Sequence, residues 1–459
     1  MSSTTTTITN PSPYEDIQLP PWPSSRPPSS TRTRAVAEEE ASNLHPIQNA
    51  LPPTDEGYHA WLALFGAFLS NGLIWGFALS FGIMQEYYTS HEPFTSQGGI
   101  AAIGTTCTGL MYLTMPVYLW IFQRWPRWRQ YALYASLPIV AASLIGASFT
   151  DKVSGLVVTQ GVLYAIGGNA LVMPSINYIN EWFVRRRGLA LGIAIAGDGT
   201  GGVIMPLILQ GLLSKVGLRW TLRIVAAMIV VPAAPLPFIL KPRLPVSSTH
   251  VAPPVDASFL RSPLFWILQV FNVVEALGYF LPTNYLPSIA EALGLSSTLG
   301  SLTVLFVNFA AVFGCIGVGV LVDRFDVTTV MLGVSICAGL AVFTVLGFTT
   351  SIAPLYVFSV VYGLTAGGYS TNWAGMIKII QGKHDGADAN LIFGLFAAGR
   401  GVGSIVSGPL SESLLESAKG FSESASSAYG SEYGNIIVFA GTTAVAGGLG
   451  WFVRKAGIM

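Results

Sequence analysis

Three ionisable side chains stand out inside long apolar stretches, where a charge is costly: Asp198, Glu275 and Arg400. An ionisable residue inside a membrane span usually faces a cavity or a charged partner. The planar guanidinium of Arg400 could bind a substrate carboxylate through two hydrogen bonds. Burial favours the neutral form of a carboxylic acid, so Glu275 or Asp198 could carry a proton. The alternative for each is a structural bond to a neighbouring helix.

Amide and aromatic residues accompany these charges. Asn272 and Tyr279 lie three residues before and four residues after Glu275, which places all three on one face of a helix. Asn71, Asn177 and Trp373 also lie in apolar stretches and are further candidates for contacting a ligand. Aromatic side chains in spans often only pack or lie at the membrane interface, which is the alternative for Tyr279 and Trp373.

Catalytic chemistry is not expected from this chain. An enzyme would need a cluster such as paired histidines or a Ser/His/Asp set, and the five histidines all fall in tails or loops. The run from Gly197 to Gly202 fits a dinucleotide fingerprint, but that motif must follow a strand. Close helix packing explains these glycines better. We therefore expect no cofactor, no metal and no enzymatic activity.

The elements that must position these side chains are twelve apolar stretches of about 20 residues, enough to cross a hydrocarbon core of roughly 30 Å as a helix. A bilayer offers no water to backbone amides, so spans of this kind must be helical. The stretches are residues 61–82, 99–122, 131–149, 156–178, 188–213, 222–240, 264–289, 299–322, 328–348, 352–377, 391–414 and 435–453.

Composition agrees with a membrane protein. Charged residues make up 10% of the chain and mean hydropathy is +0.57, whereas soluble domains carry about 25% charged residues. The formal net charge of zero gives no basic surface for nucleic acid. The expected partners are the lipid bilayer, a small-molecule substrate and a proton. The oligomeric state stays open.

The distribution of lysine and arginine predicts the topology. Most of these residues fall in the loops that follow the even-numbered spans and at the C-terminal end. Since positive charge favours the cytoplasmic side, both termini are expected in the cytoplasm. Residues 1–55 are rich in Ser, Thr and Pro and are predicted to be a disordered cytoplasmic tail. Residues 241–262 form a Pro-rich linker between halves at 56–240 and 263–459.

The two halves share a pattern that indicates an internal duplication. A set of glycine and charged positions in the fifth span recurs 202 residues later in the eleventh span. The first set is Gly192, Gly197, Asp198, Gly199 and Gly201, and the second is Gly394, Gly399, Arg400, Gly401 and Gly403. Two parallel six-helix repeats with a site between them are typical of the major facilitator superfamily.

Two motifs carry a closer resemblance. Residues 182–197, WFVRRRGLALGIAIAG, resemble the signature of the monocarboxylate porter family within that superfamily, and residues 55–61 resemble a weaker version of its first-span motif. The loop at 317–325 is similar to the superfamily motif G-x-L-x-D-R. The resemblance implies that the loop residues form a gate: Asp323 and Arg324, together with Arg185, Arg186 and Arg187.

The resemblance implies an all-α membrane protein of twelve transmembrane helices in two pseudo-symmetric six-helix bundles. Two departures limit what it carries over. The first span contains no lysine, and Asn308 and Val312 stand where proton-coupled members have an Asp and an Arg. Asn308 is therefore a candidate for binding substrate rather than a proton.

These observations predict a secondary transporter that moves a small organic anion or carboxylate-bearing metabolite by alternating access. We expect proton symport and a place in the plasma membrane. One alternative is an exporter of a fungal secondary metabolite, and another is a non-transporting nutrient sensor. Substrate identity, direction and coupling ion stay open.

Overall fold

The computed structural model describes residues 52–243, 256–418, 428–431 and 433–457. The predicted tail at 1–55 therefore lies outside the described residues except for its last four positions. The predicted linker at 241–262 is described only at its two ends.

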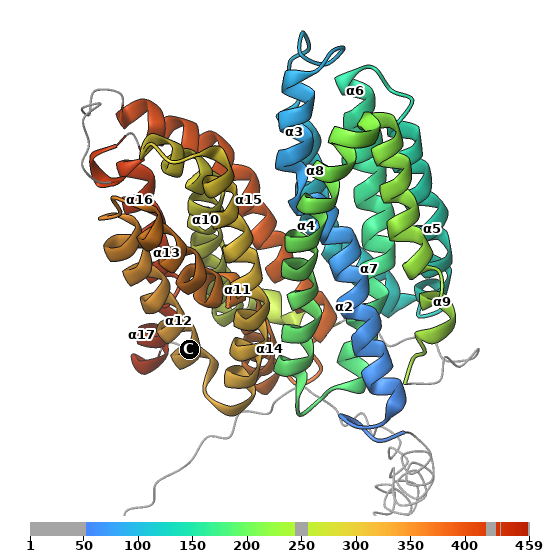
Figure 1. Cartoon of the computed structure of the whole chain (residues 1–459). Coiled ribbons are helices and arrows are strands. Elements are labelled where there is room, and N and C mark those ends of the chain that lie inside the picture. Colours follow the sequence, from blue (N-terminus) through green and yellow to red (C-terminus); the bar gives the residue numbers. More distant parts are fainter. Residues whose placement is uncertain (1–51, 244–255, 419–427, 432, 458–459) are drawn as a thin grey trace, which may run out of the picture. The chain divides into compact units, whose positions relative to one another are not determined.

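Helices make up the N-terminal half, which runs from blue to light green in Figure 1. Its elements are α2 (Tyr58–Leu79), α3 (Phe81–Ser90), α4 (Ala101–Arg124), α5 (Trp128–Ala147), α6 (Val153–Leu156), the π-helix η1 (Val157–Leu163), α7 (Tyr164–Trp182), α8 (Arg187–Ala233) and α9 (Leu236–Ile239).

The C-terminal half is also helical and runs from yellow to red in Figure 1. Its α-helices are α10 (Pro263–Ala292), α11 (Ser297–Arg324), α12 (Val327–Leu340), α13 (Ile352–Thr365), α14 (Trp373–Lys383), α15 (Ala389–Ala418), α16 (Gly434–Ala446) and α17 (Gly450–Lys455). The π-helix η3 (Ala341–Leu346) and the 3-10 helices η2 (Ser258–Arg261), η4 (Ala366–Asn372) and η5 (Ala428–Gly430) complete it.

The all-helical prediction is confirmed for the described residues, which contain no strand. Ten of their helical segments are long and apolar enough to cross a membrane. One of them, Arg187–Ile239, has 53 residues, which at about 1.5 Å per residue is more than twice the hydrocarbon thickness. Gly217 interrupts it with a φ of 72°, between the two spans predicted there. The count of twelve spans stays a prediction.

Glycines set the contacts between the two halves, where α8 lies against α11 and α4 lies against α15. A Cβ added to Gly199 would be 2.9 Å from the carbonyl oxygen of Asn308, and one added to Gly192 would be 2.4 Å from that of Cys315. On the other side, Gly401 meets Tyr112 and Gly394 meets Pro116 at 2.5 and 2.6 Å. Only glycine allows backbones to approach so closely.

The alternate glycines of the same helices pack within each half. A Cβ on Gly201 would be 2.1 Å from the carbonyl oxygen of Gly72 in α2. A Cβ on Gly403 would be 2.6 Å from the Cβ of Ala276 in α10. The spacing repeated in the sequence therefore corresponds to a repeated packing arrangement. α8 and α15 each face their own half with one set of glycines and the opposite half with the other.

Candidate functional site

A cavity of about 40 Å³ lies between the two halves. Four helices of the N-terminal half and three elements of the C-terminal half line it. Its walls are mainly apolar and aromatic, with a few polar groups, which is the usual character of a small-molecule site. The lining residues are Asn71, Trp75, Tyr112, Met115, Met173, Ile176, Ile195, Asp198, Ser370, Trp373, Phe393 and Arg400.

Asp198 is held in the wall of this cavity by its neighbours in the chain. Gly197 packs against the backbone of α2 and Gly199 against that of α11, so the residue between them has little freedom to move. The Oδ1 atom of Asp198 is buried and has no hydrogen-bond partner among the described residues. A buried polar atom without a partner is costly in a folded protein and often marks a functional position.

Arg400 occupies the equivalent position of α15, between Gly399 and Gly401. Its Nη1 donates a hydrogen bond to Oε2 of Glu275 at 3.0 Å, and both side chains are buried. The guanidinium also lies over the ring of Tyr279, 4.2 Å from the ring centroid. The structure thus brings together three predicted site residues from α10 and α15, although Glu275 and Tyr279 lie behind Arg400 and do not line the central cavity.

Asn272 reaches the cavity only through another residue. The indole Nε1 of Trp373 donates to its Oδ1 at 2.8 Å, and its Nδ2 donates to the carbonyl of Phe396 at 2.8 Å. Asn272 therefore fixes the orientation of Trp373, which does line the cavity. Asn272 thus acts on the cavity only by holding Trp373 in place.

Asn177 and Asn308 were also candidates for substrate contact, and neither lines the cavity. Asn177 is fully buried and donates to the carbonyl of Met173 one turn earlier in α7. Asn308 donates across the halves to the carbonyl of Gly202 at 3.4 Å. Asn71 does line the cavity, with its amide nitrogen bound to Ala67 O at 2.8 Å.

Sequence reasoning missed Tyr112, Ser370 and Phe393, which belong to the lining. None is charged, and each lies in an apolar or glycine-rich run like many others. The contact of Tyr112 with Gly401 of the opposite half is a tertiary contact that the sequence does not reveal.

A second, smaller cavity of about 10 Å³ lies inside the C-terminal half, next to Glu275. Tyr279, Tyr362, Tyr369 and Ser335 contribute to its walls. The Ser335 hydroxyl is buried and has no hydrogen-bond partner among the described residues. Glu275 therefore lies between its arginine partner and a polar void about the size of one water molecule.

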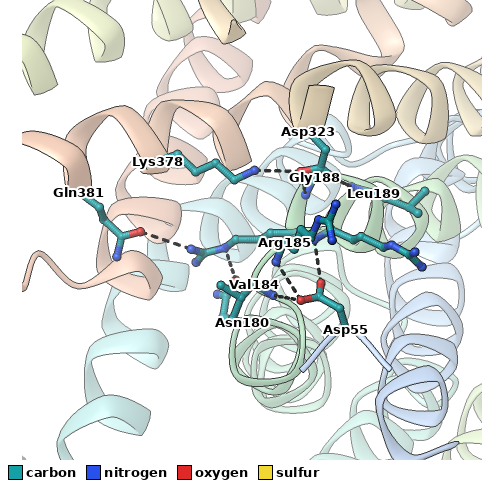
Figure 2. Close-up of polar contacts among 11 residues, drawn as sticks. Asp55, Asn180, Val184, Arg185, Gly188, Leu189, Asp323, Lys378 and Gln381 are labelled. Carbon is teal, nitrogen blue, oxygen red and sulfur yellow. Dashed lines mark hydrogen bonds and ion pairs between the residues drawn. The ribbon is translucent and has the colours of Figure 1, made fainter. Parts of the chain in front are cut away.

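The two halves are joined at one end of the bundle by a polar network. We call this the basic end, formed by the loops at residues 123–129, 183–187, 241–243, 323–326 and 378–388. Figure 2 shows Asp323 accepting hydrogen bonds from the backbone N–H groups of Gly188 and Leu189 at 2.9 and 2.8 Å, and one from Lys378 Nζ at 3.0 Å. A carboxylate at the N-terminus of a helix is also favoured by the helix dipole.

Asp55 contacts the adjoining part of the same segment. Its carboxylate accepts from the N–H groups of Arg185 and Arg186 at 2.9 and 2.7 Å (Figure 2). The sequence had suggested only a family motif at this position. Asp55 directly precedes the N-terminal half and was predicted to end the disordered tail, but these bonds hold it in place. The start of α8 is therefore bound by one carboxylate just before its own half and by Asp323 of the opposite half.

The predicted gate residues differ in what they do. Arg187 is buried, and its Nε donates to Asn180 Oδ1 at 2.9 Å while its Nη1 reaches Gln381 at 3.5 Å across the halves. The side chains of Arg185, Arg186 and Arg324 are exposed to solvent. Several hydrogen bonds between the halves lie at or next to the basic end, whereas those of Asn308 with Gly202 and of Arg400 with Tyr112 lie further along the bundle.

Asp388 begins α15 next to this network and accepts from the N–H of Leu391 at 2.7 Å. Burial raises the pKa of Asp388 above its usual value, and its backbone hydrogen bonds and the charges of Arg187 and Arg129 offset part of that rise. The charged form of Asp388 is thus disfavoured by folding.

Comparison with known proteins identifies the family. Residues 60–408 match the sequence model of the Major Facilitator Superfamily. The chain belongs to this superfamily. Membership makes it a multi-pass membrane transporter that handles a small molecule within the bilayer. The finer assignment to the monocarboxylate porter family stays a resemblance.

Several curated fungal proteins are similar along most of their length. The MFS transporter asaE of Aspergillus flavus is 29% identical over 400 residues, 86% of this chain and 86% of that protein. The agnestins efflux protein AgnL12 of Paecilomyces divaricatus is 30% identical over 75% of this chain and 78% of its own. The aspyridones efflux protein apdF of Emericella nidulans is 27% identical over 84% of this chain and 78% of its own.

Proposed function

We propose that this transporter exports an organic metabolite through the cavity between its two halves. The observation that carries the proposal is the cavity itself, which combines aromatic walls with Asp198 and Arg400 at equivalent positions of the two repeats. The similarity to proteins named for the efflux of agnestins and aspyridones supports export over uptake. A fungal secondary metabolite is the class of substrate that these names favour.

Transport of a small organic anion by proton symport, our first expectation from the sequence, is the second candidate. Arg400 has the fork geometry that binds a carboxylate. Its buried partner Glu275 would have to leave before a substrate carboxylate could take its place. Transport of an anion therefore requires Arg400 to exchange Glu275 for the substrate. Export of another kind of metabolite leaves the Arg400–Glu275 pair intact.

Alternating access would act through the basic end. In the described arrangement, Asp323 ties α11 to the start of α8, and Asn180 and Arg187 reach the C-terminal half beside it. Opening the cavity toward this end requires these bonds to break. We propose that Asp323 and Arg187 form the gate and that Asp55 keeps the start of α8 in shape while the gate opens.

Proton coupling is part of the proposal, with Glu275 and Asp198 as the groups that would carry the proton. Both are carboxyl residues buried near one guanidinium, where small changes in their surroundings alter their protonation. The lysine and arginine distribution supports a cytoplasmic basic end and cytoplasmic termini, and the plasma membrane is the expected location.

Metabolite levels inside and outside producing cells test the function. Deletion of the gene should raise the intracellular level of at least one metabolite several-fold and lower its extracellular level. The wild-type gene should restore both, while Arg400→Gln, present in the membrane in equal amount, should not. Arg219→Gln, which changes an exposed pair with Asp151, is the matched control and should restore export. Unchanged ratios, or a lower intracellular level after deletion, would contradict export.

A further inference from the structure

The central cluster contains more acid than base. Asp198 and Arg400 line the cavity, and Glu275 pairs with Arg400 directly behind it. If both carboxyl groups were ionised, the cluster would carry a net negative charge between the two halves. A buried charge of this kind is costly unless a cation or a proton balances it. The cluster is therefore suited to holding one positive charge from outside the protein.

Arg400 is already engaged. Its guanidinium donates to Glu275 at 3.0 Å and lies 4.2 Å from the centroid of the Tyr279 ring. Both of these partners belong to α10 in the same half, and a hydrogen bond to Tyr112 of α4 links Arg400 to the opposite half. A substrate anion would find this guanidinium neutralised by Glu275.

Asp198 is in the opposite situation. Its Oδ1 is buried and has no hydrogen-bond partner among the described residues, although the side chain lines the cavity. An ionised carboxylate only accepts hydrogen bonds, so its complementary ligand group is a donor. Charged donors make the stronger bonds, which favours a protonated amine over a neutral N–H or O–H.

The remaining wall fits the rest of such a ligand. Trp75, Trp373 and Phe393 line the same cavity and provide flat apolar surfaces. Aromatic faces also attract cations, most strongly when water is excluded. The site thus combines one carboxylate with aromatic walls, the arrangement that suits an apolar molecule with a single cationic donor.

We propose that Asp198 binds the substrate directly through an N–H donor, with a protonated amine as the preferred group, and that a proton competes with this donor for the same carboxyl. This inference rests on the proposed export function. When the amine binds, the proton of Asp198 leaves to the solvent. Because substrate and proton exclude each other, the exporter is a proton antiporter. An anion on Arg400 with a proton on Glu275 would instead give symport.

The titratable groups around Asp198 come from four helices. Arg400 of α15, Tyr112 of α4 and Cys315 of α11 lie within electrostatic reach, and Glu275 of α10 acts through its pair with Arg400. The charge of Arg400 favours an ionised Asp198 and burial favours the neutral acid, so a bound cation can decide which form is present.

Binding of three matched probes to the purified full chain in lipid nanodiscs tests the proposal. The probes are 1-naphthylmethylammonium, 1-naphthylmethanol and 1-naphthoate, which share a ring and differ in the polar group. At pH 8 the ammonium should bind at least tenfold more tightly than the naphthoate. The preference should shrink as the pH falls, and addition of the ammonium to weakly buffered protein should release protons.

Three variants show which carboxyl group is responsible for the preference for the ammonium. Asp198→Asn should lose the preference for the ammonium and the proton release but still bind the alcohol, which shows that the cavity is intact. Glu275→Gln should weaken the preference without abolishing it, because Arg400 then loses its own partner and neutralises part of the charge of Asp198. Asp151→Asn, which removes an exposed carboxylate paired with Arg219, should behave as the wild type.

Two results would overturn the inference: equal or tighter binding of the naphthoate, or no binding of the ammonium at millimolar concentration. A preference that survives in Asp198→Asn and disappears in Glu275→Gln would also overturn it. Failure of the proposed function looks different. Cells that export normally without the gene would contradict export even if the ammonium binds through Asp198.

Discussion

The N-terminal and C-terminal halves share one packing frame but carry opposite chemistry at its centre. Gly199 and Gly401 each contact the opposite half, and Gly201 and Gly403 each contact their own. Between these glycines the first half has Asp198 and the second half has Arg400. The comparison teaches that backbone packing requires the glycines in both copies, while the residue they bracket is free to differ.

The halves also differ in how each charge is satisfied. Arg400 has Glu275 from its own half, whereas Asp198 has an Oδ1 without a partner. In the C-terminal half the charge is therefore part of the internal structure. In the N-terminal half one carboxyl oxygen has no partner, and we propose that a ligand supplies it. This asymmetry predicts that substitutions of Arg400 and of Asp198 have different consequences.

Removal of Arg400 should have the largest effect. Arg400→Met leaves Glu275 buried without its partner, which typically costs about 3–5 kcal/mol. We expect a large loss of thermal stability in detergent and no transport. The double variant Arg400→Met with Glu275→Gln should recover most of the stability but none of the transport. Equal stability of the single and double variants would show that the pair is not an internal structural element.

Glycine substitutions should test the shared frame. In Gly201→Ala the new Cβ would meet the carbonyl oxygen of Gly72, so we expect a loss of about 1–3 kcal/mol. Gly211→Ala in the same helix has no atom within 4 Å and should be neutral or gain up to about 1 kcal/mol. Gly403→Ala and Gly408→Ala form the matched pair in α15. In thermal unfolding, the Gly201 and Gly403 variants should each be less stable than the control variant of the same helix. An unchanged stability of Gly403→Ala would contradict the equivalence of the two halves.

Asp323 should matter for the balance between conformations more than for folding. Asp323→Ala removes the acceptor that joins the halves at the start of α8, an effect of about 1 kcal/mol or roughly fivefold in population. Cysteine labelling at the basic end should become several-fold faster. Asp326→Ala is the control, because Asp326 caps α12 and pairs with Arg454 within the C-terminal half. Equal labelling rates in the two variants would remove Asp323 from the gate.

Asp388 should give the smallest effect. Because its pKa is raised in the folded state, ionisation of Asp388 favours unfolding, and stability is lost as the pH rises through that pKa. Asp388→Asn keeps a capping side chain and removes the charge. It should be more stable than the wild type at pH 7.5 by at most about 1 kcal/mol. The difference should vanish at pH 4, and a loss of stability at pH 7.5 would contradict this account.

The sequence was informative about the fold because lipid imposes simple rules. Long apolar stretches and the repeated glycines indicated helices in two related halves. The break at Gly217 appeared as a gap between two stretches. The sequence could not settle the exact number of membrane crossings, because the structure continues some predicted spans into longer helices.

The site was only partly predictable. Asp198, Glu275 and Arg400 stood out because charges are rare in spans, but the pairing of Glu275 with Arg400 joins helices 125 residues apart in the sequence. Helical spacing correctly placed Asn272 near Glu275 and could not reveal that it orients Trp373. The uncharged lining residue Tyr112 and the capping role of Asp55 depend on tertiary contacts that no local pattern encodes.

The account depends most on a central cavity that opens in turn to each side of the membrane. Ser370 lines this cavity, so Ser370→Cys in a chain without Cys107, Cys315 and Cys337 gives a direct reporter. Ser359→Cys is the control, because that residue is fully buried inside the C-terminal half. We predict that a membrane-impermeant thiol reagent labels position 370 from either side and leaves position 359 unlabelled. Labelling of position 370 from one side alone, or from neither, would contradict alternating access to this site.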